Sequence, residues 1–305
     1  MAVATKKIKE KEAKTPNAKP EKLSFGFLSQ QRIWSRFVVI LGVITYIWYT
    51  AKDGKETTLA KQKDVVQRRG QVFECDSNYL TEVKQFANCE PKKCGRYISD
   101  KIVTTNEVEV LLKIAKRGFA LGSSDRGVSI LDLHSGALSF GEQLVNIHSF
   151  VESKNILNPA DLAVYKIVKA KIQHAIAETF QIGINQLQIA HPTFFSRVTN
   201  LDPKTVHNEY WHVHVDEDVN KSFHYTSVLY LADYGREFAG GRLTFLDTQK
   251  TNVTLEPRKG RVVMFTSGRE NTHHVERVAS GTRYAMTVSF SCDVKKAIKD
   301  PVTPK

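Results

Sequence analysis

Hydrophobic residues recur at helical spacing in two stretches of the first two thirds of the chain. The segment 104–118 opens with Thr-Thr-Asn-Glu, the spacing of a capping box, and its apolar residues then follow three and four positions apart. The segment 158–183 opens with a capping Asn and with Pro159 at the first helical position, and it continues as an amphipathic pattern. Between them, 122–141 is rich in glycine and serine, and its apolar run at 128–131 predicts a short strand within a loop.

From residue 187 onward the hydrophobic pattern changes to a period of two, which is typical of strands with one buried face. Short β-rich runs, separated by turn residues, span 187–198, 210–216, 224–234, 240–247, 251–257, 260–267, 273–278 and 281–291. Short strands at such spacing are typical of a double-sheet jelly roll. We therefore predict an α+β fold with a jelly-roll (double-stranded β-helix) domain at 186–293, a helical support region at 101–185 and a C-terminal tail at 294–305.

One apolar run lies outside this domain. The sequence FVVILGVITYIWYTA at 37–51 carries no charge and is bounded by Arg36 and Lys52. It is shorter than the roughly 20 residues that span a bilayer, but it has no hydrophilic face, which argues against a buried core helix. The 36 residues before it exceed the usual basic region of a cleaved signal peptide. We therefore expect an uncleaved transmembrane signal-anchor at 37–51 that contacts the lipid bilayer.

The charge of the chain is concentrated at its N-terminus. Of the formal net charge of +12, half lies in residues 1–36, where nine Lys or Arg face three Glu. The chain is otherwise 41% hydrophobic and 25% charged, as in ordinary globular proteins. Because the basic excess belongs to a tail and no nucleic-acid-binding motif is visible, we do not expect nucleic acid as a partner. We predict a basic cytoplasmic tail at 1–36 and a stem with a Cys-containing segment at 52–100.

The cysteines and two glycosylation triplets bear on the compartment. An even number of cysteines beyond an apolar anchor is compatible with two disulfides, whose pairing stays open, among Cys75, Cys89, Cys94 and Cys292. A zinc site would need a second pair of matching spacing, which is missing. Asn220 and Asn252 each begin an acceptor triplet for N-linked glycans. These features favour a single-pass type II protein whose C-terminal domain is lumenal or extracellular, in the endoplasmic reticulum or Golgi.

Two short segments near the C-terminal end carry the candidate chemistry. In HVHVD at 212–216, alternate residues of a strand would face one side, so imidazoles and a carboxylate would project together. About sixty residues later, HHVE at 273–276 offers a further imidazole, and Arg283 follows on the next β-rich run. Two histidines and one carboxylate form the facial triad of non-haem Fe(II) oxygenases. On the residues alone, either histidine of each segment is a candidate ligand.

These segments resemble the prolyl 4-hydroxylase branch of the 2-oxoglutarate- and Fe(II)-dependent dioxygenases over about residues 190–293. The matching sequences are HVD at 214–216, SVLYL at 227–231, GGRLTF at 240–245, PRKGRVVMF at 257–265, and the pair His273 and Arg283. The resemblance implies that His214, Asp216 and His273 are the ligands of Fe(II). His212 and His274 then become neighbours of the metal site.

The resemblance also assigns the cosubstrate site. It implies that Arg283 binds the distal carboxylate of 2-oxoglutarate, because a fixed guanidinium grips both oxygens and does not lose its proton. Tyr230 would add a hydroxyl to that carboxylate, and Thr287, on the same strand face as Arg283, is a further candidate for binding the cosubstrate. The chain departs from the family at 194–196, where Phe-Phe-Ser replaces a tyrosine that often precedes the metal-binding pair.

The implied function is that of a membrane-anchored dioxygenase. Such an enzyme converts 2-oxoglutarate to succinate and CO2 while it hydroxylates a prolyl or lysyl side chain of a polypeptide in the secretory pathway, with ascorbate as a further expected cofactor. Three alternatives stay open. A cupin-like metal protein would use His212, His214 and His273 and would have no need of Arg283. A catalytically silent jelly-roll binding module would ignore 2-oxoglutarate, and a membrane-tethered interaction protein would act through its tail and stem.

Overall fold

The computed structural model of the protein describes residues 27–50, 55–122, 127–141, 143–151, 156–202, 211–247 and 251–301. The chain divides into two compact units between residues 53 and 54. In the first unit, helix α1 (Phe27–Thr50) contains most of the predicted anchor, and the side chains described within it are exposed. Among the described residues, no helix combines the length and the apolarity that crossing a membrane requires. The transmembrane segment predicted at 37–51 is therefore not confirmed.

Both predicted helices are present in the second unit. Helix α3 (Thr105–Leu121) begins with the predicted capping box, in which Thr104 accepts from the Glu107 backbone and the Glu107 carboxylate accepts from the Thr104 backbone. Helix α4 (Pro159–Phe180) begins with Asn158, whose side chain accepts from the backbone N–H of Asp161 at 2.8 Å. The short helix α2 (Ser77–Val83) precedes them and was not predicted.

The strands form two sheets. The larger sheet contains β2 (Arg69–Phe73), β3 (Cys94–Ser99), β12 (Val262–Thr266), β8 (Tyr225–Tyr230), β14 (Val278–Ser291), β7 (Gln188–Thr199), β4 (Val128–Leu131), β5 (Ala137–Phe140) and β6 (Gln143–Asn146) in that order, with β9 (Phe238–Gly240) paired to β14. The smaller sheet contains β1 (Lys55–Ala60), β11 (Thr251–Leu255), β10 (Leu243–Leu246) and β13 (His273–Val275). Short helices are α5 (Asp216–Val219), η1 (Ile147–Ser149), η3 (Ile184–Gln186), η5 (Arg269–Asn271) and η6 (Val294–Lys296).

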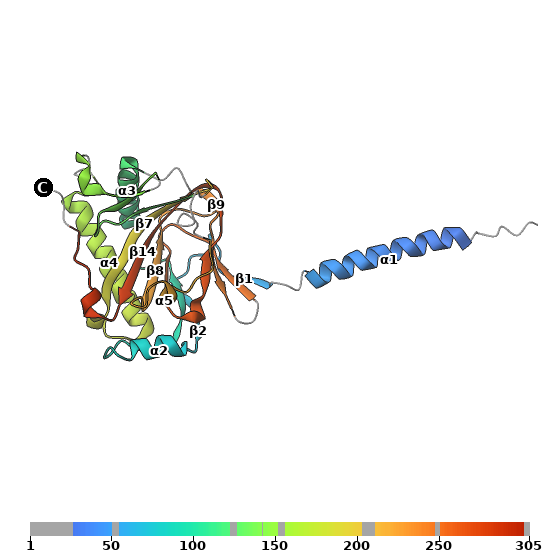
Figure 1. Cartoon of the computed structure of the whole chain (residues 1–305), viewed down its shortest axis with the longest axis horizontal. Coiled ribbons are helices and arrows are strands. Elements are labelled where there is room, and N and C mark those ends of the chain that lie inside the picture. The colour runs from blue at the N-terminus through green and yellow to red at the C-terminus, as the bar shows by residue number, and fades with distance from the viewer. Residues whose placement is uncertain are drawn as a thin grey trace, which may run out of the picture. The chain divides into compact units, whose positions relative to one another are not determined.

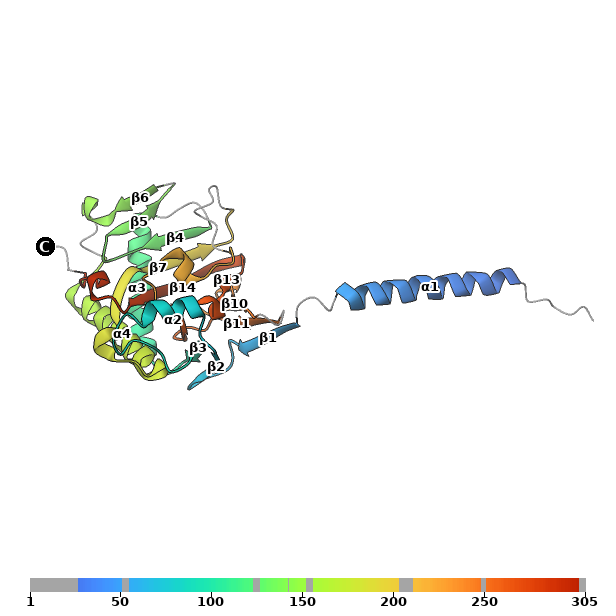
Figure 2. The same cartoon turned by 60° about the horizontal axis from the view of Figure 1, so that its bottom comes forward.

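The larger sheet is buried on both faces. Along β12, Val262 and Met264 point into a core shared with α3 and α4, whereas Val263 and Phe265 point into a core shared with the smaller sheet. Figures 1 and 2 show the two helices on one side of the larger sheet and the strands of the smaller sheet on the other. The fold is therefore α+β with facing sheets whose pairings are antiparallel apart from β1 with β11, as the change of hydrophobic period predicts.

Three boundary predictions need correction. The predicted stem at 52–100 is part of the domain from residue 55 onward, because β1 pairs with β11 in parallel and β2 and β3 extend the larger sheet. The predicted helical region at 101–185 also supplies β5 and β6 to that sheet, whereas β4 confirms the short strand predicted at 128–131. The predicted tail at 294–305 packs on the domain as far as it is described, since the backbone N–H of Ile298 donates to Ile189 at 3.0 Å. The edge strands β1 and β2 are largely polar, so they lack the alternation of apolar and polar residues on which the prediction of strands relied.

The four cysteines form two disulfides. Cys75 is joined to Cys94, and Cys89 is joined to Cys292 across a sequence separation of 203 residues. The second bond ties the segment before β3 to the end of β14. Of the three pairings that the sequence leaves open, this is the one in the structure, and no cysteine is free.

Candidate metal centre

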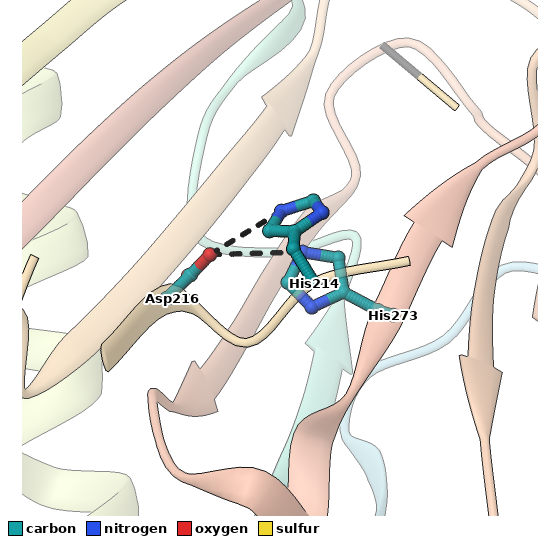
Figure 3. A group of neighbouring side chains, drawn as sticks. All are labelled: His214, Asp216 and His273. Carbon is teal, nitrogen blue, oxygen red and sulfur yellow. Dashed lines mark ion pairs between the residues drawn. The ribbon is translucent and has the colours of Figure 1, made fainter. Parts of the chain in front are cut away.

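The predicted metal ligands come together from three different local structures. His214 and His273 exchange backbone hydrogen bonds of 2.9 and 3.0 Å as an isolated β-bridge, and Asp216 is the first residue of α5. One ligand atom from each of the three residues lies within 4.8 Å of the others. Figure 3 shows both imidazoles turned toward the Asp216 carboxylate. The described residues of the strand predicted at 210–216 do not form a strand, because only His214 among them is paired, with His273 of β13.

Hydrogen bonds orient both imidazoles for coordination. The Nδ1 atom of His214 lies 2.9 Å from the carbonyl oxygen of His212, and that of His273 lies 2.8 Å from the carbonyl of Asn271. A carbonyl can only accept, so each Nδ1 carries the proton and each Nε2 keeps its lone pair. The two Nε2 atoms lie 3.6 and 3.8 Å from Oδ1 of Asp216. The three donor atoms therefore face one point.

The surroundings of His273 favour its neutral form. Its ring packs against Phe245 and Phe265, with ring centroids 5.6 and 5.0 Å away. Burial lowers the pKa of His273, nearby His214 acts in the same direction, and Asp216 opposes both. A neutral imidazole is the form that binds a metal ion. Two imidazoles and one carboxylate match the donor set of an Fe(II) facial triad.

The competing histidines lie outside this cluster. The ring of His212 is exposed beside Trp211, with ring centroids 6.0 Å apart, and only its backbone carbonyl serves the site. His274 is paired with Thr244 in the smaller sheet. Neither belongs to the group of described residues whose ligand atoms converge. A ligand set of His212, His214 and His273, as in the cupin-like alternative, does not fit this geometry.

Arg283 is a buried cation beside the metal centre. Its side chain is 4% exposed, and its Nε donates to the carbonyl of Gly241 at 3.0 Å. Among the described residues, no carboxylate lies within ion-pairing distance of it. Its guanidinium carbon lies 5.2 Å from the ring centroid of Tyr230, whose buried hydroxyl has no hydrogen-bond partner within the described chain. Burial raises the pKa of Tyr230, so the hydroxyl is a donor. An unpaired cation and an unpaired donor are suited to binding a carboxylate.

One cavity of about 360 Å³ joins these groups. Its walls include the three converging side chains together with Arg283 and Thr287, which β14 presents on one face. Tyr230 is not among its lining residues but lies behind Arg283. Phe194 and Ser196, which stand where the family often has a tyrosine, also line the cavity. The volume is within the range of small-molecule sites.

Several supporting residues were missed by the sequence analysis. Thr226 donates to Oδ2 of Asp216 at 2.5 Å and lies 3.1 Å from the hydroxyl of Ser267. Asn271 positions His273 through its carbonyl, and its own amide donates to the carbonyl of Gly95. Thr226 reaches Asp216 across ten positions of sequence and the Asn271 carbonyl reaches His273 across two, so both contacts are short in sequence but depend on the folded path of the chain. The Gly-Gly pair at 240–241 could have indicated a close approach of the backbone to another group. A Cβ at Gly241 would lie 3.0 Å from Cδ of Arg283, so glycine leaves room for that side chain.

The two glycosylation candidates differ in their surroundings. Asn220 is exposed just after α5, and its side-chain oxygen accepts from the backbone and the hydroxyl of Ser222. Asn252 is half-buried in β11, which is paired with β1 on one side and β10 on the other. The structure leaves the modification of both as a prediction.

Comparison with known proteins gives a consistent result. Residues 203–291 match the profile of the 2OG-Fe(II) oxygenase superfamily. The chain is 46% identical over 275 residues to 2-oxoglutarate and iron-dependent oxygenase domain-containing protein 3 of Xenopus tropicalis, covering 88% of this chain and 86% of that protein. It is 36% identical over 80 residues to human prolyl 3-hydroxylase 1, covering 26% and 10%. Among solved structures, a prolyl hydroxylase of Trichoplax adhaerens with a peptide fragment of hypoxia inducible factor aligns with a TM-score of 0.46 and 16% identity, covering 70% and 88%.

Proposed function

Because the chain belongs to the family of 2-oxoglutarate and iron-dependent oxygenase domain-containing protein 3, within the 2OG-Fe(II) oxygenase superfamily, we propose that it hydroxylates a prolyl side chain of a polypeptide in the secretory pathway. The chain is a 2-oxoglutarate-dependent dioxygenase. We also propose that the two facing sheets form the jelly roll predicted from the strand pattern.

The residues of the site fit Fe(II) and 2-oxoglutarate. His214, Asp216 and His273 would hold the iron, and Arg283, which lines the cavity with the Tyr230 ring packed against its guanidinium, would hold the distal carboxylate of 2-oxoglutarate. When bound, the pair supplies the oxidative decarboxylation of 2-oxoglutarate, coupled to the insertion of one oxygen atom of O2 into a substrate C–H bond. Ascorbate, which the family resemblance implies, stays a prediction that is tested by omitting it from the assay.

The chain's own residues orient the groups that would hold the reactants. Thr226 holds the second oxygen of Asp216, which leaves Oδ1 directed at the imidazoles. Gly241 accepts a hydrogen bond from Nε of Arg283, which fixes the side chain in the wall of the cavity. Apolar side chains such as Val228 and Phe223 line much of the remaining wall. The cavity wall is therefore largely apolar, while the His214 side chain keeps 36% of its surface exposed.

The lining of the cavity favours a prolyl over a lysyl side chain, and this observation carries the proposal. Asp216 is the one carboxylate among the described lining residues, and Arg283 already places a positive charge in the same space. A lysyl ammonium would enter without a counter-charge, which is costly in a site of low polarity. A proline ring carries no charge and packs on apolar walls. The similarity to prolyl 3-hydroxylase 1 supports this choice.

The compartment is proposed from the disulfides. Two disulfides form and persist in oxidising compartments such as the endoplasmic reticulum and the cell surface. Polypeptides that pass through the secretory pathway are then the available substrates. Attachment to a bilayer through residues 37–51 rests on the sequence alone, and extraction of the protein from membranes at alkaline pH tests it.

The test is hydroxylation of paired peptides by the purified protein. Two libraries of extended peptides, identical except for proline or lysine at the central position, are incubated with Fe(II), 2-oxoglutarate and isotopically labelled O2. We expect label in proline-centred peptides, with one succinate released for each oxygen incorporated, and none with His273→Ala. Label in lysine-centred peptides alone would reject the prolyl assignment. Absence of both label and 2-oxoglutarate binding would reject the enzymatic proposal as a whole.

A further inference from the structure

A second cavity, of about 580 Å³, lies apart from the metal centre and is rich in basic side chains. We call it the basic pocket. It is formed where the start of β7 and the segment after α5 meet the C-terminal segment 295–301. Its cationic lining residues are Lys295, Lys296 and Lys299. His134, His148 and His191 line it as well, and His191 lies 3.3 Å from Oδ2 of Asp132. None of these is used by the chemistry described above.

A buried polar network fixes one wall of the basic pocket. Lys169 is 2% exposed, and its Nζ donates to Oδ1 of Asp300 at 2.7 Å. The ring of His134 lies 2.7 Å from the carbonyl of Lys299 through Nδ1 and 3.0 Å from the hydroxyl of Tyr165 through Nε2. The C-terminal segment is thereby tied to α4 by groups that are largely inside the protein. The lysines of that segment are presented from a fixed backbone.

The basic pocket has an excess of positive charge. Asp300 is the one carboxylate among its described lining residues, and it is already paired with Lys169 at 2.7 Å and Lys166 at 3.5 Å. The side chains of Lys295, Lys296 and Lys299 are exposed, and among the described residues none of them has an ion-pair partner. A concave surface lined by charges of one sign concentrates ligands of the opposite sign. The pocket is therefore suited to an anionic group.

The basic pocket borders the catalytic cavity along two chain segments. On β7, Pro192 lines the catalytic cavity and Ala190 lines the basic pocket. After α5, Val219 lines the catalytic cavity and the next residue, Asn220, lines the basic pocket. Asn220 is four positions beyond the metal-binding Asp216, about 6 Å along a helix. With the reach of a lysine side chain, the anion would lie on the order of 10–15 Å from the metal, three or four residues of an extended peptide.

We propose that the basic pocket binds an aspartate or glutamate side chain of the polypeptide substrate, three or four residues from the hydroxylated position. This inference rests on the proposed function, because the peptide must also enter the catalytic cavity. It gives the enzyme a means of selecting one proline among many, which an apolar cavity alone does not provide. Lys295 and Lys296 are the residues whose charge carries the selection.

The experiment measures binding and turnover of a positional series of peptides. Each peptide has a central proline in an uncharged extended sequence and a single glutamate at one position, and its partner carries glutamine there. Binding to the full-length protein is followed by fluorescence anisotropy without O2, in the presence of 2-oxoglutarate and Fe(II). We expect glutamate to tighten binding about three- to tenfold at three or four residues on one side of the proline, and nowhere else.

Two double variants with equal loss of charge separate the pocket from general electrostatics. Lys295→Gln with Lys296→Gln should abolish the glutamate effect, whereas Lys92→Gln with Lys113→Gln, both exposed and outside the pocket, should preserve it. Binding that is indifferent to glutamate in every position would overturn the inference. Survival of the glutamate effect in the double variant of Lys295 and Lys296 would also overturn it. The same holds if a sulfated oligosaccharide binds the basic pocket and the glutamate peptide does not.

The failure of this inference can be told apart from that of the proposed function. Binding of 2-oxoglutarate to the metal-loaded protein is measured in the same samples and does not depend on the basic pocket. If 2-oxoglutarate binds and proline peptides are hydroxylated without glutamate dependence, the inference alone fails. If 2-oxoglutarate does not bind, the proposed function fails and the inference fails with it.

Discussion

Replacing Arg283 by methionine should remove the stabilisation of the protein by 2-oxoglutarate while leaving the unliganded fold intact. Arg283 is 4% exposed and has no described carboxylate partner, so its charge is compensated only when an anion binds. The substitution relieves an uncompensated buried charge, which is favourable, but it also leaves the buried carbonyl of Gly241 without its donor, which costs about 1–3 kcal/mol. These effects oppose each other, so we expect the melting temperature of the unliganded protein to change by only a few degrees.

The effect on the liganded protein is larger. Hydrogen bonds between a guanidinium and a carboxylate contribute about 1.5–3 kcal/mol, so the dissociation constant of 2-oxoglutarate should rise about 10- to 150-fold. At a concentration one hundred times the dissociation constant, 2-oxoglutarate stabilises the wild-type protein by about 2.7 kcal/mol. A hundredfold weaker variant gains about 0.4 kcal/mol at the same concentration. For a domain of this size, these values correspond to shifts of about 5–10 °C and about 1 °C in melting temperature.

The assay is thermal unfolding with and without 2-oxoglutarate, with Mn(II) in place of Fe(II) to prevent turnover. Arg242→Met is the matched control, because Arg242 is adjacent in sequence to Gly241 but is paired with Glu56 and Glu276. It should lower the melting temperature and keep the 2-oxoglutarate shift. An undiminished shift in Arg283→Met would refute the assignment of the cosubstrate site. Loss of the shift in both variants would show that the assay reports stability rather than binding.

Three further predictions follow from the contacts around the site and the core. Thr226→Val, which removes the hydroxyl that holds the carboxylate ligand, should weaken metal binding about 10- to 100-fold in a metal titration, whereas Thr226→Ser should retain it; equal affinity in both would contradict the role of the hydroxyl. Burial lowers the pKa of His224 from 6.5 to about 4, so the unfolded state takes up a proton at a higher pH than the folded state. The free energy of unfolding should therefore be highest above about pH 6.5 and fall by up to about 3 kcal/mol toward pH 4. His224→Asn should flatten this pH dependence, as measured by urea unfolding. Removing the Cys89–Cys292 disulfide by serine substitution should cost about 5 kcal/mol, against about 3 kcal/mol for the disulfide that closes the shorter loop, and an equal loss for both would argue against the loop-length reasoning.

Local signals predicted the helices correctly because their stabilising contacts are local. The capping box of α3 is complete within residues 104–107, so the side chains that define the start of the helix are readable from adjacent positions. The same holds for the cap of α4 at Asn158. Strand β1 was missed because its partner β11 lies far along the chain, with Lys55 opposite Thr251, and because its residues are mostly polar. Nothing within such a segment indicates its partner.

The candidate metal ligands lie together for a reason that differs from the one first inferred. The alternation of HVHVD predicted a strand, but Asp216 starts a helix, so His214 and Asp216 do not face one side through the pleat of a strand. The family resemblance, and not the spacing, distinguished His214 from His212. Thr226 and Asn271 were not predicted, although Thr226 contacts Asp216 only ten positions away and the Asn271 carbonyl contacts His273 two positions away, because many residues at these distances carry a hydroxyl or a carbonyl and nothing in the pattern distinguishes these two.

The most direct test of the dioxygenase site is an anaerobic titration of the purified protein with Fe(II) and then 2-oxoglutarate, followed through the visible charge-transfer band of chelated 2-oxoglutarate. We expect a band that saturates at one 2-oxoglutarate for each protein, disappears in His214→Ala and weakens in Arg283→Ala. Folded, metal-loaded protein that shows no band would contradict the assignment of His214, Asp216 and His273 as the iron site of a 2-oxoglutarate-dependent enzyme.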